Sequence, residues 1–153
     1  MGRSSAVRRR SWRALSYPVV VVGALSVLAA CSSGQSQARA GGSTVRVTER
    51  DFRISATPAR VAAGDVVLSV RNRGPEQHEF IVVRARGAAL PLRVDGVTID
   101  EDALEAAKIG GLEPGAPGSL RQLRLRLAPG RYELFCNMAG HYLGGMHTQL
   151  VVS

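Results

Sequence analysis

The residues with the clearest chemical potential lie near the C-terminus, where a thiol, an imidazole and a thioether follow one another at equal spacing. Cys136, His141 and Met146 form the pattern Cys-x4-His-x4-Met, with glycines between them that allow the loop to fold around one ion. Nitrogen and soft sulfur ligands suit copper and fit the geometry of blue-copper electron-transfer sites. Such a site requires a second imidazole, and His78 is the candidate because it stands at the start of a predicted strand.

The loop leaves two alternatives, a different fourth ligand and a different metal. His147 competes with Met146 for the weak fourth position, but adjacent residues of a strand point to opposite faces. Zinc also binds thiolate and imidazole, although structural zinc sites use four firm ligands and rarely a thioether. Four firm ligands require His147, so copper is favoured, while zinc can still occupy the site adventitiously where supply favours it. Met138, inside the loop, is interpreted as a packing side chain.

Length and composition limit the other functions open to the chain. Its 153 residues allow one domain, and only two cysteines, Cys31 and Cys136, are present, which excludes a disulfide-rich scaffold. Three histidines are too few for an enzyme with several histidine-rich metal centres. The acidic residues are too scattered to predict a general acid–base pair, so we expect no enzyme.

The positive charge is concentrated at the N-terminus. The net charge is +8, but residues 1–30 carry five arginines and no acid, which leaves 20 − 5 = 15 basic against 12 acidic residues elsewhere, or +3. No basic stripe interleaved with aromatic residues follows, so we expect no nucleic-acid binding.

Residues 1–30 have the pattern of an export signal: a basic head through Arg13, an apolar run from Ala14 to Ala30, and small residues before Cys31. The sequence Leu28-Ala29-Ala30-Cys31 resembles the lipobox of bacterial lipoproteins. That resemblance implies cleavage before Cys31, lipidation of Cys31, and attachment to the extracytoplasmic face of a bacterial cell membrane. The adjacent arginines Arg9 and Arg10 leave Sec and twin-arginine export both open.

The mature chain divides into a tether and a domain. Residues 31–43 are rich in Ser, Gly and Gln and predict a flexible tether, and residues 44–153 form the domain. Apolar alternation predicts strands over 44–54, 66–72, 79–85, 119–127, 131–136 and 147–152. Such short strands separated by turns predict a β-sandwich of about seven strands. Residues 86–118 break the rhythm, and acids at the start of 100–108 predict a short helix within this long connection.

The strand and loop residues together resemble the cupredoxins of the plastocyanin–azurin type. The resemblance lies in Val66-x-Leu68-x-Val70-x-Asn72-x-Gly74-x-x-x-His78-Glu79-Phe80, in Leu127-x-Pro129-Gly130-x-Tyr132-x-x-x-Cys136, and in the loop that follows. It implies an all-β Greek-key sandwich and one type 1 copper ion held by His78, Cys136, His141 and Met146. The loop departs from plastocyanins, since four residues rather than two separate Cys136 from His141.

The implied function is a membrane-tethered, monomeric carrier of single electrons. We expect His141 to face solvent at the edge of the site, and Met138, Tyr142 and Leu143 to form an apolar docking patch for transient redox partners. The alternative is an extracytoplasmic copper chaperone or buffer that uses the same ligands without carrying electrons.

Overall fold

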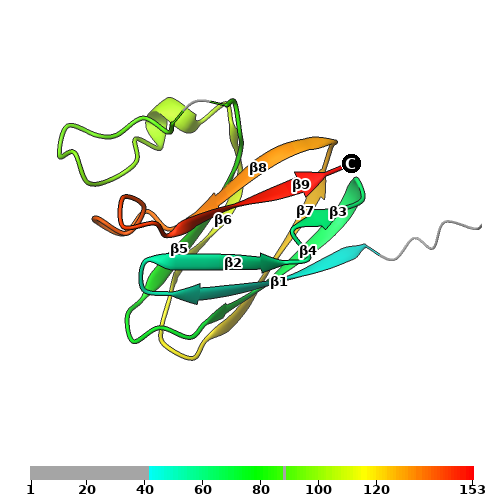
Figure 1. Cartoon of the computed structure of the whole chain (residues 1–153), viewed down its shortest axis with the longest axis horizontal. Helices are drawn as coiled ribbons and strands as arrows, with labels where there is room; N and C mark the ends of the chain where they lie inside the picture. The colour runs from blue at the N-terminus through cyan, green and yellow to red at the C-terminus, as the bar shows by residue number, and fades with distance from the viewer. Residues whose placement is uncertain (1–41, 88) are drawn as a thin grey trace, which may run out of the picture. The chain divides into compact units, whose positions relative to one another are not determined.

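The computed structural model describes residues 42–87 and 89–153, in which nine strands form two sheets (Figure 1). The strands are β1 (Ser43–Arg50), β2 (Arg53–Thr57), β3 (Arg60–Val61), β4 (Gly64–Asn72), β5 (His78–Arg84), β6 (Lys108–Gly115), β7 (Leu120–Leu127), β8 (Gly130–Phe135) and β9 (His147–Val152). The first sheet has the order β2-β1-β4-β7 and the second β3-β9-β8-β5-β6. The predicted export signal, the lipidation at Cys31 and nearly all of the tether lie outside the described residues.

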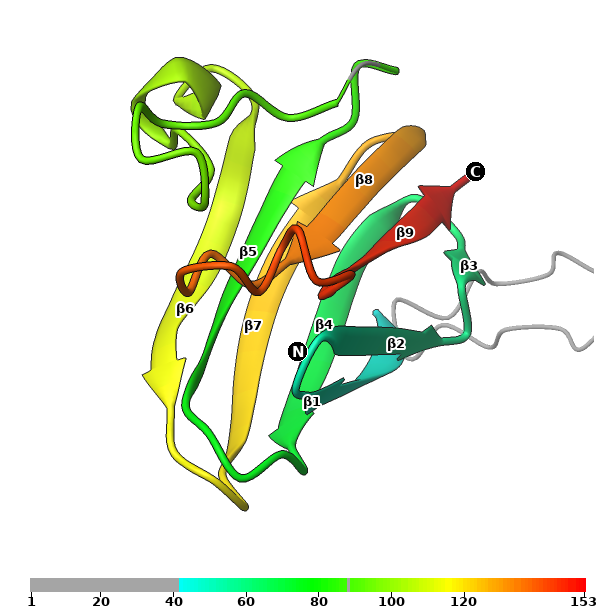
Figure 2. The ribbon, with the colours of Figure 1, turned by 60° about the vertical axis from the view of Figure 1, so that its left-hand side comes forward.

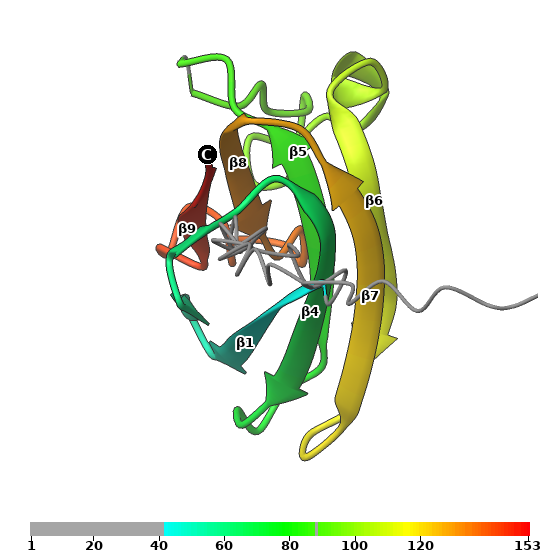
Figure 3. The same ribbon diagram turned by 90° about the vertical axis from the view of Figure 1, so that its right-hand side faces the viewer.

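Alternating apolar residues on the strands of the first sheet place one face against the core. Val45 and Val47 of β1 and Val66, Leu68 and Val70 of β4 are all buried, while the residues between them are partly or fully exposed. The sheets are mixed, because β1 pairs in parallel with β4 and β3 with β9, whereas the other pairs are antiparallel. The all-β sandwich predicted from the alternation is thus confirmed (Figure 3).

The predicted single strand over residues 44–54 is wrong. A turn at Asp51 and Phe52 divides it into β1 and β2, which pair antiparallel. Phe52 has a φ of 58°, a conformation that a bulky residue seldom adopts outside a turn. The turn matters for function because it brings Asp51 to the end of the sandwich where His78 lies.

The long, partly helical connection is also corrected. The predicted helix over residues 100–108 is reduced to one 3-10 turn, Asp102–Leu104, and Lys108–Gly115 forms strand β6 instead. Strand β6 pairs antiparallel with β5 and lies beside it in Figure 2. Without β6, strand β5 would be an open sheet edge. The hydrogen bonds that β6 forms along it outweigh the weak helical preference of the end of the predicted helix. Ile99, Leu104 and Ala107 pack on a second apolar cluster with residues of β5.

The start of β5, the end of β8 and two connections lie at one end of the sandwich. Because β5 and β8 are antiparallel, with Ile81 opposite Phe135, the start of β5 and the end of β8 lie at the same edge. In Figure 1 the β8–β9 loop and the β1–β2 turn lie together at the left-hand end. No helix within the described ranges has the length and apolar character needed to cross a membrane.

Candidate metal centre

Three potential ligands converge at this end. His78 opens β5, Cys136 directly follows β8, and His141 lies in the β8–β9 loop. One ligand atom from each lies within 4.8 Å of the others, and all three residues are buried. The Sγ atom of Cys136 is 3.6 Å from Nδ1 of His141, and the two imidazole centroids are 5.3 Å apart. The sequence-predicted thiol and imidazoles are therefore brought together.

Met146 lies beside the same cluster. It is fully buried and belongs to the same apolar core as Cys136. Its backbone is tied to two of the ligands, since Cys136 N donates to Met146 O at 3.1 Å and Met146 N donates to His141 O at 2.9 Å. These bonds close the β8–β9 loop into a ring. The Cys-x4-His-x4-Met spacing therefore places Met146 next to Cys136.

The loop that carries His141 is shaped by consecutive turns. His141 N donates to Met138 O, Gly144 N to Gly140 O, and Gly145 N to Tyr142 O, each at 2.9 Å. These short-range bonds satisfy much of the backbone locally, and Gly140 N also donates to Val97 O at 3.0 Å, which ties the loop to the β5–β6 connection.

The unpartnered atoms of His78 fit a metal ligand. Its side chain is fully buried, and neither Nδ1 nor Nε2 has a hydrogen-bond partner among the described residues. Nε2 does lie 3.1 Å from Oδ1 of Asp51, a contact without hydrogen-bond geometry. A buried polar atom without a partner costs about 1–3 kcal/mol, a cost that coordination of a metal at Nδ1 would remove. Two imidazoles, a thiol and a thioether form a donor set that suits copper.

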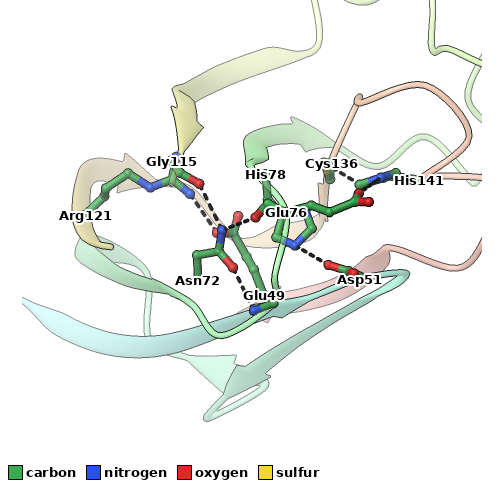
Figure 4. A network of polar contacts seen from close by, with 10 residues as sticks. Glu49, Asp51, Asn72, Glu76, His78, Gly115, Arg121, Cys136 and His141 are labelled. Atoms are coloured by element: carbon green, nitrogen blue, oxygen red, sulfur yellow. Dashed lines mark hydrogen bonds and ion pairs between the residues drawn. The ribbon is translucent and has the colours of Figure 1, made fainter. Parts of the chain in front are cut away.

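Both histidines face a carboxylate on the side away from the cluster. Asp51 Oδ1 is 3.1 Å from Nε2 of His78, and Glu76 Oε2 is 3.2 Å from Nε2 of His141 (Figure 4). A carboxylate at one ring nitrogen orients the ring and leaves the other nitrogen free to bind metal. Here that arrangement reserves the Nδ1 atoms for the cluster. Sequence reasoning missed both carboxylates, because nothing in the spacing of Asp51 or Glu76 marks them as partners of the ligands.

Burial keeps the metal-free cluster uncharged at Cys136 and His78. It raises the pKa of the Cys136 thiol to about 11, although hydrogen bonds from the backbone of Met138 and Glu79 act in the opposite direction. Burial, together with the neighbouring His141, lowers the pKa of His78. Because a metal ligand must be deprotonated, binding of a metal would release the thiol proton.

His141 is more enclosed than expected. We predicted that it faces solvent, but it is only 6% exposed. The ring of Phe52 lies over it, with centroids 5.2 Å apart, and Glu76 covers its Nε2 edge. Phe52 itself is 52% exposed and comes from the unforeseen turn between β1 and β2. The outer surface of the site is thus formed by residues that the sequence did not single out.

His147 and the three expected docking residues differ in their contacts and in their exposure. His147 stays outside the ligand group, because its Nδ1 lies 3.2 Å from Glu133 Oε1 and its ring stacks on Tyr142 at 4.7 Å. Tyr142 is half-buried and donates its hydroxyl to Glu133 at 3.0 Å. Met138 is half-buried against the main core, and Leu143 is 55% exposed.

The segment that leads to His78 is held by one buried asparagine. The Nδ2 atom of Asn72 donates to Glu76 O at 2.7 Å and to Gly115 O at 2.9 Å, and its Oδ1 accepts from Gly74 N at 2.8 Å (Figure 4). A Cβ at position 74 would lie 2.5 Å from Asp51 Oδ1 and 2.8 Å from His78 Nε2. Gly74 therefore packs directly against the Asp51–His78 pair, where no larger side chain fits.

Comparison with solved structures gives the class of fold. Auracyanin from the photosynthetic bacterium Roseiflexus castenholzii matches with a TM-score of 0.56 and 22% identity, over 74% of this chain and 99% of that one. Auracyanin A of Chloroflexus aurantiacus, described as a blue copper protein, matches with a TM-score of 0.54 and 19% identity, over 74% and 100%. Rusticyanin of Thiobacillus ferrooxidans matches with a TM-score of 0.53 and 18% identity, over 73% and 79%.

These relatives are cupredoxins, and the domain described here has the cupredoxin fold. No family model and no curated protein sequence matches the chain. At its metal-site end the fold carries the histidine, cysteine, histidine and methionine suited to one type 1 copper ion.

Proposed function

We propose that this protein is a blue copper protein that carries single electrons, with His78, Cys136, His141 and Met146 as copper ligands. The observation that carries the proposal is the convergence of two imidazole nitrogens and a thiol sulfur within 4.8 Å in a buried site, with Met146 next to them in the core. When bound, copper would supply the one-electron couple.

The residues around the candidate ligands suit a carrier whose metal site changes its oxidation state while the ligands keep their positions. Backbone bonds between Cys136, Met146 and His141 hold the loop, and Asp51 and Glu76 hold the imidazoles from behind. A ligand set held in one arrangement keeps the rearrangement between the two oxidation states small. We propose a carrier rather than an enzyme, because all four candidate ligands are buried, which leaves little room for a substrate beside them.

The route for electrons is proposed to pass through His141 and the side chains over it. His141 is the ligand nearest the loop surface, and Phe52 lies against its ring. The exposed Leu143 and the half-buried Met138 and Tyr142 flank this point and are proposed to contact a transient partner. We further propose that a lipid on Cys31 attaches the monomer to the extracytoplasmic face of the cell membrane, so that partners in that membrane meet it at raised effective concentration.

The decisive experiment is absorption spectroscopy and voltammetry of the copper-loaded full chain. An intense visible thiolate-to-copper band and a reversible one-electron couple are expected. Rapid loss of copper to a chelator without a reversible couple would instead support the copper chaperone or buffer. Burial of His78, Cys136 and His141 argues against such rapid exchange.

A further inference from the structure

Charge is distributed unevenly over the domain. Residues 95–113 hold six acids and one basic residue. The strands and turns of the first sheet, residues 43–57, 64–73 and 120–127, hold eight arginines and three acids. A domain that is nearly balanced in total charge is therefore strongly polarised, and such polarity steers the approach of charged partners.

Three of these arginines surround one hollow. Arg50, Arg71 and Arg73 line a surface cavity of about 420 Å³, together with Asn72, Gly74 and Gly118. All three arginines are exposed, and within residues 42–87 and 89–153 none of them forms an ion pair. The hollow thus gathers three positive charges that form no ion pair with a carboxylate of the described residues.

The floor of the hollow is held in place. Asn72 is fully buried, and its side chain makes the three hydrogen bonds described above. Its carbonyl accepts from Gly118 N at 3.0 Å, and Arg73 N donates to Glu49 O at 2.8 Å. The backbone that carries the arginines is therefore ordered before any ligand arrives, which lowers the cost of binding.

The hollow also adjoins the metal site. Gly74 lines the hollow, and a Cβ on it would lie 2.8 Å from Nε2 of His78. The backbone of Gly74 and the adjoining Asp51 thus lie between the hollow and the imidazole of His78. A binding surface in this position brings its occupant close to the residues through which an electron would pass.

We propose that this arginine hollow is the charged part of the docking surface for the electron-transfer partner, in addition to the contacts proposed around His141, and that the partner presents carboxylates to it. The inference rests on the proposed function and adds the chemistry of the partner. Planar guanidinium groups bind carboxylates through paired hydrogen bonds, which favours them for this contact. Transient redox complexes use small interfaces, so a contact centred on this hollow beside the candidate metal site suits one.

The position of the hollow favours a protein over a lipid headgroup. Strand β1 runs from Ser43 to Arg50, so the chain enters the domain at one end and reaches the hollow at the other. Eight residues of extended strand separate these ends by roughly 25 Å. The hollow therefore lies far from Ser43, where the preceding chain joins the domain. A partner protein can approach it from the end of the domain that is farther from Ser43.

The first test measures binding without any redox step. Fluorescein-labelled hexaglutamate is titrated against the full chain, metal-free and copper-loaded, and followed by anisotropy. The test variant combines Arg50→Gln, Arg71→Gln and Arg73→Gln. The control combines Arg60→Gln, Arg86→Gln and Arg131→Gln, which remove the same charge at the opposite end of the strands. We expect the test variant to bind about tenfold more weakly or worse, and the control to bind nearly as the wild type does, with an affinity that salt reduces.

The second test measures electron transfer. The reduced, copper-loaded protein passes one electron to hexacyanoferrate(III), an anion, or to tris(phenanthroline)cobalt(III), a cation, in stopped flow. At low ionic strength the test variant should react about tenfold more slowly than the control with the anion. With the cation it should react no more slowly than the control.

The failures are distinguishable. Absence of a reversible couple in the copper-loaded protein would overturn the proposed function, while hexaglutamate binding would still test the hollow. Equal loss of binding in the control would show that only net charge matters, and would overturn the docking site. Binding to phosphatidylglycerol vesicles through the three arginines, without binding to hexaglutamate, would replace the acidic protein with a lipid surface.

Discussion

The carboxylate behind His78 gives the most specific prediction of the site geometry. Asp51→Asn keeps the shape of the side chain but removes the negative charge 3.1 Å from the ring. We expect weaker copper binding and a higher reduction potential. The oxidised ion carries one more positive charge than the reduced ion, so the loss of a nearby negative charge destabilises the oxidised form more.

The magnitude follows from the burial of the two partners. Loss of a group that orients a metal ligand typically costs 10- to 100-fold in metal affinity, or about 1.4–2.8 kcal/mol. His78 is fully buried, but the side chain of Asp51 is 26% exposed, so water screens part of its charge and the lower figure applies. If copper(II) binding falls about tenfold more than copper(I) binding, the potential rises by about 59 mV.

The assay is voltammetry together with a competitive copper titration, and circular dichroism verifies the fold. Glu133→Gln is the matched control, because Glu133 makes a similar 3.2 Å contact to His147, which is outside the ligand group. Asp51→Ala separates position from charge, since it also removes the oxygen that orients the ring. If Asp51→Asn changed the potential and the affinity no more than Glu133→Gln does, the carboxylate would not act through His78 and the reasoning would be refuted.

Four further predictions follow from the site, the core and the N-terminus. Cys136→Ser should keep the fold but lose the visible band, because a hydroxyl is a poor substitute for a soft thiolate; circular dichroism and a copper titration check this, and a persisting band would exclude Cys136 as the ligand. Met146→Gln should retain copper and shift the potential, and an unchanged potential and spectrum would exclude Met146 as a ligand. Burial raises the pKa of Glu49 to about 7, against the opposing effect of Arg121. The folded state therefore holds this proton more tightly than the unfolded state, and stability should fall by a few kcal/mol as the pH rises from about 4.5 to about 7. Urea unfolding of Glu49→Gln should lack this decline, and an unchanged pH profile would contradict it. Cys31→Ser should block lipidation, and mass spectrometry of the membrane fraction checks this, since an unmodified Cys31 in the mature native protein would refute the lipoprotein hypothesis.

The candidate ligand set could be predicted from the sequence because most of its chemistry is local. Cys136, His141 and Met146 lie on one loop, and a thiol, an imidazole and a thioether together suit few ions other than copper. His78 was added because it stands at the start of a predicted strand and matches the histidine of the cupredoxin motif, and the antiparallel pairing of β5 and β8 then places it at the same edge as Cys136. Strands with strict alternation, such as β7, were also predictable for the same reason, since a period of two reports one buried face.

The surroundings of the ligands were not accessible, because they depend on contacts between distant segments. The turn at Asp51 and Phe52 lacks a strong turn signal, and its effect on His78 and His141 appears only when β1 is placed beside β4. Strand β6 was missed because its conformation is dictated by the free edge of β5 rather than by its own residues.

The order of the second sheet has a consequence for the kinetics of folding. Strand β9 lies between β3 and β8, although it is the last of the described strands in the sequence, and β3 pairs with it across nearly the whole domain. Pairings over such long sequence separations slow folding, because the chain must close large loops before the contacts stabilise it. The second sheet therefore cannot be completed until β9 has been made, and the loop that joins Cys136 to Met146 is made only just before β9. Partly made chains would hold the early strands and His78 but no complete ion-binding pocket, so metal capture should be a late event that follows chain completion.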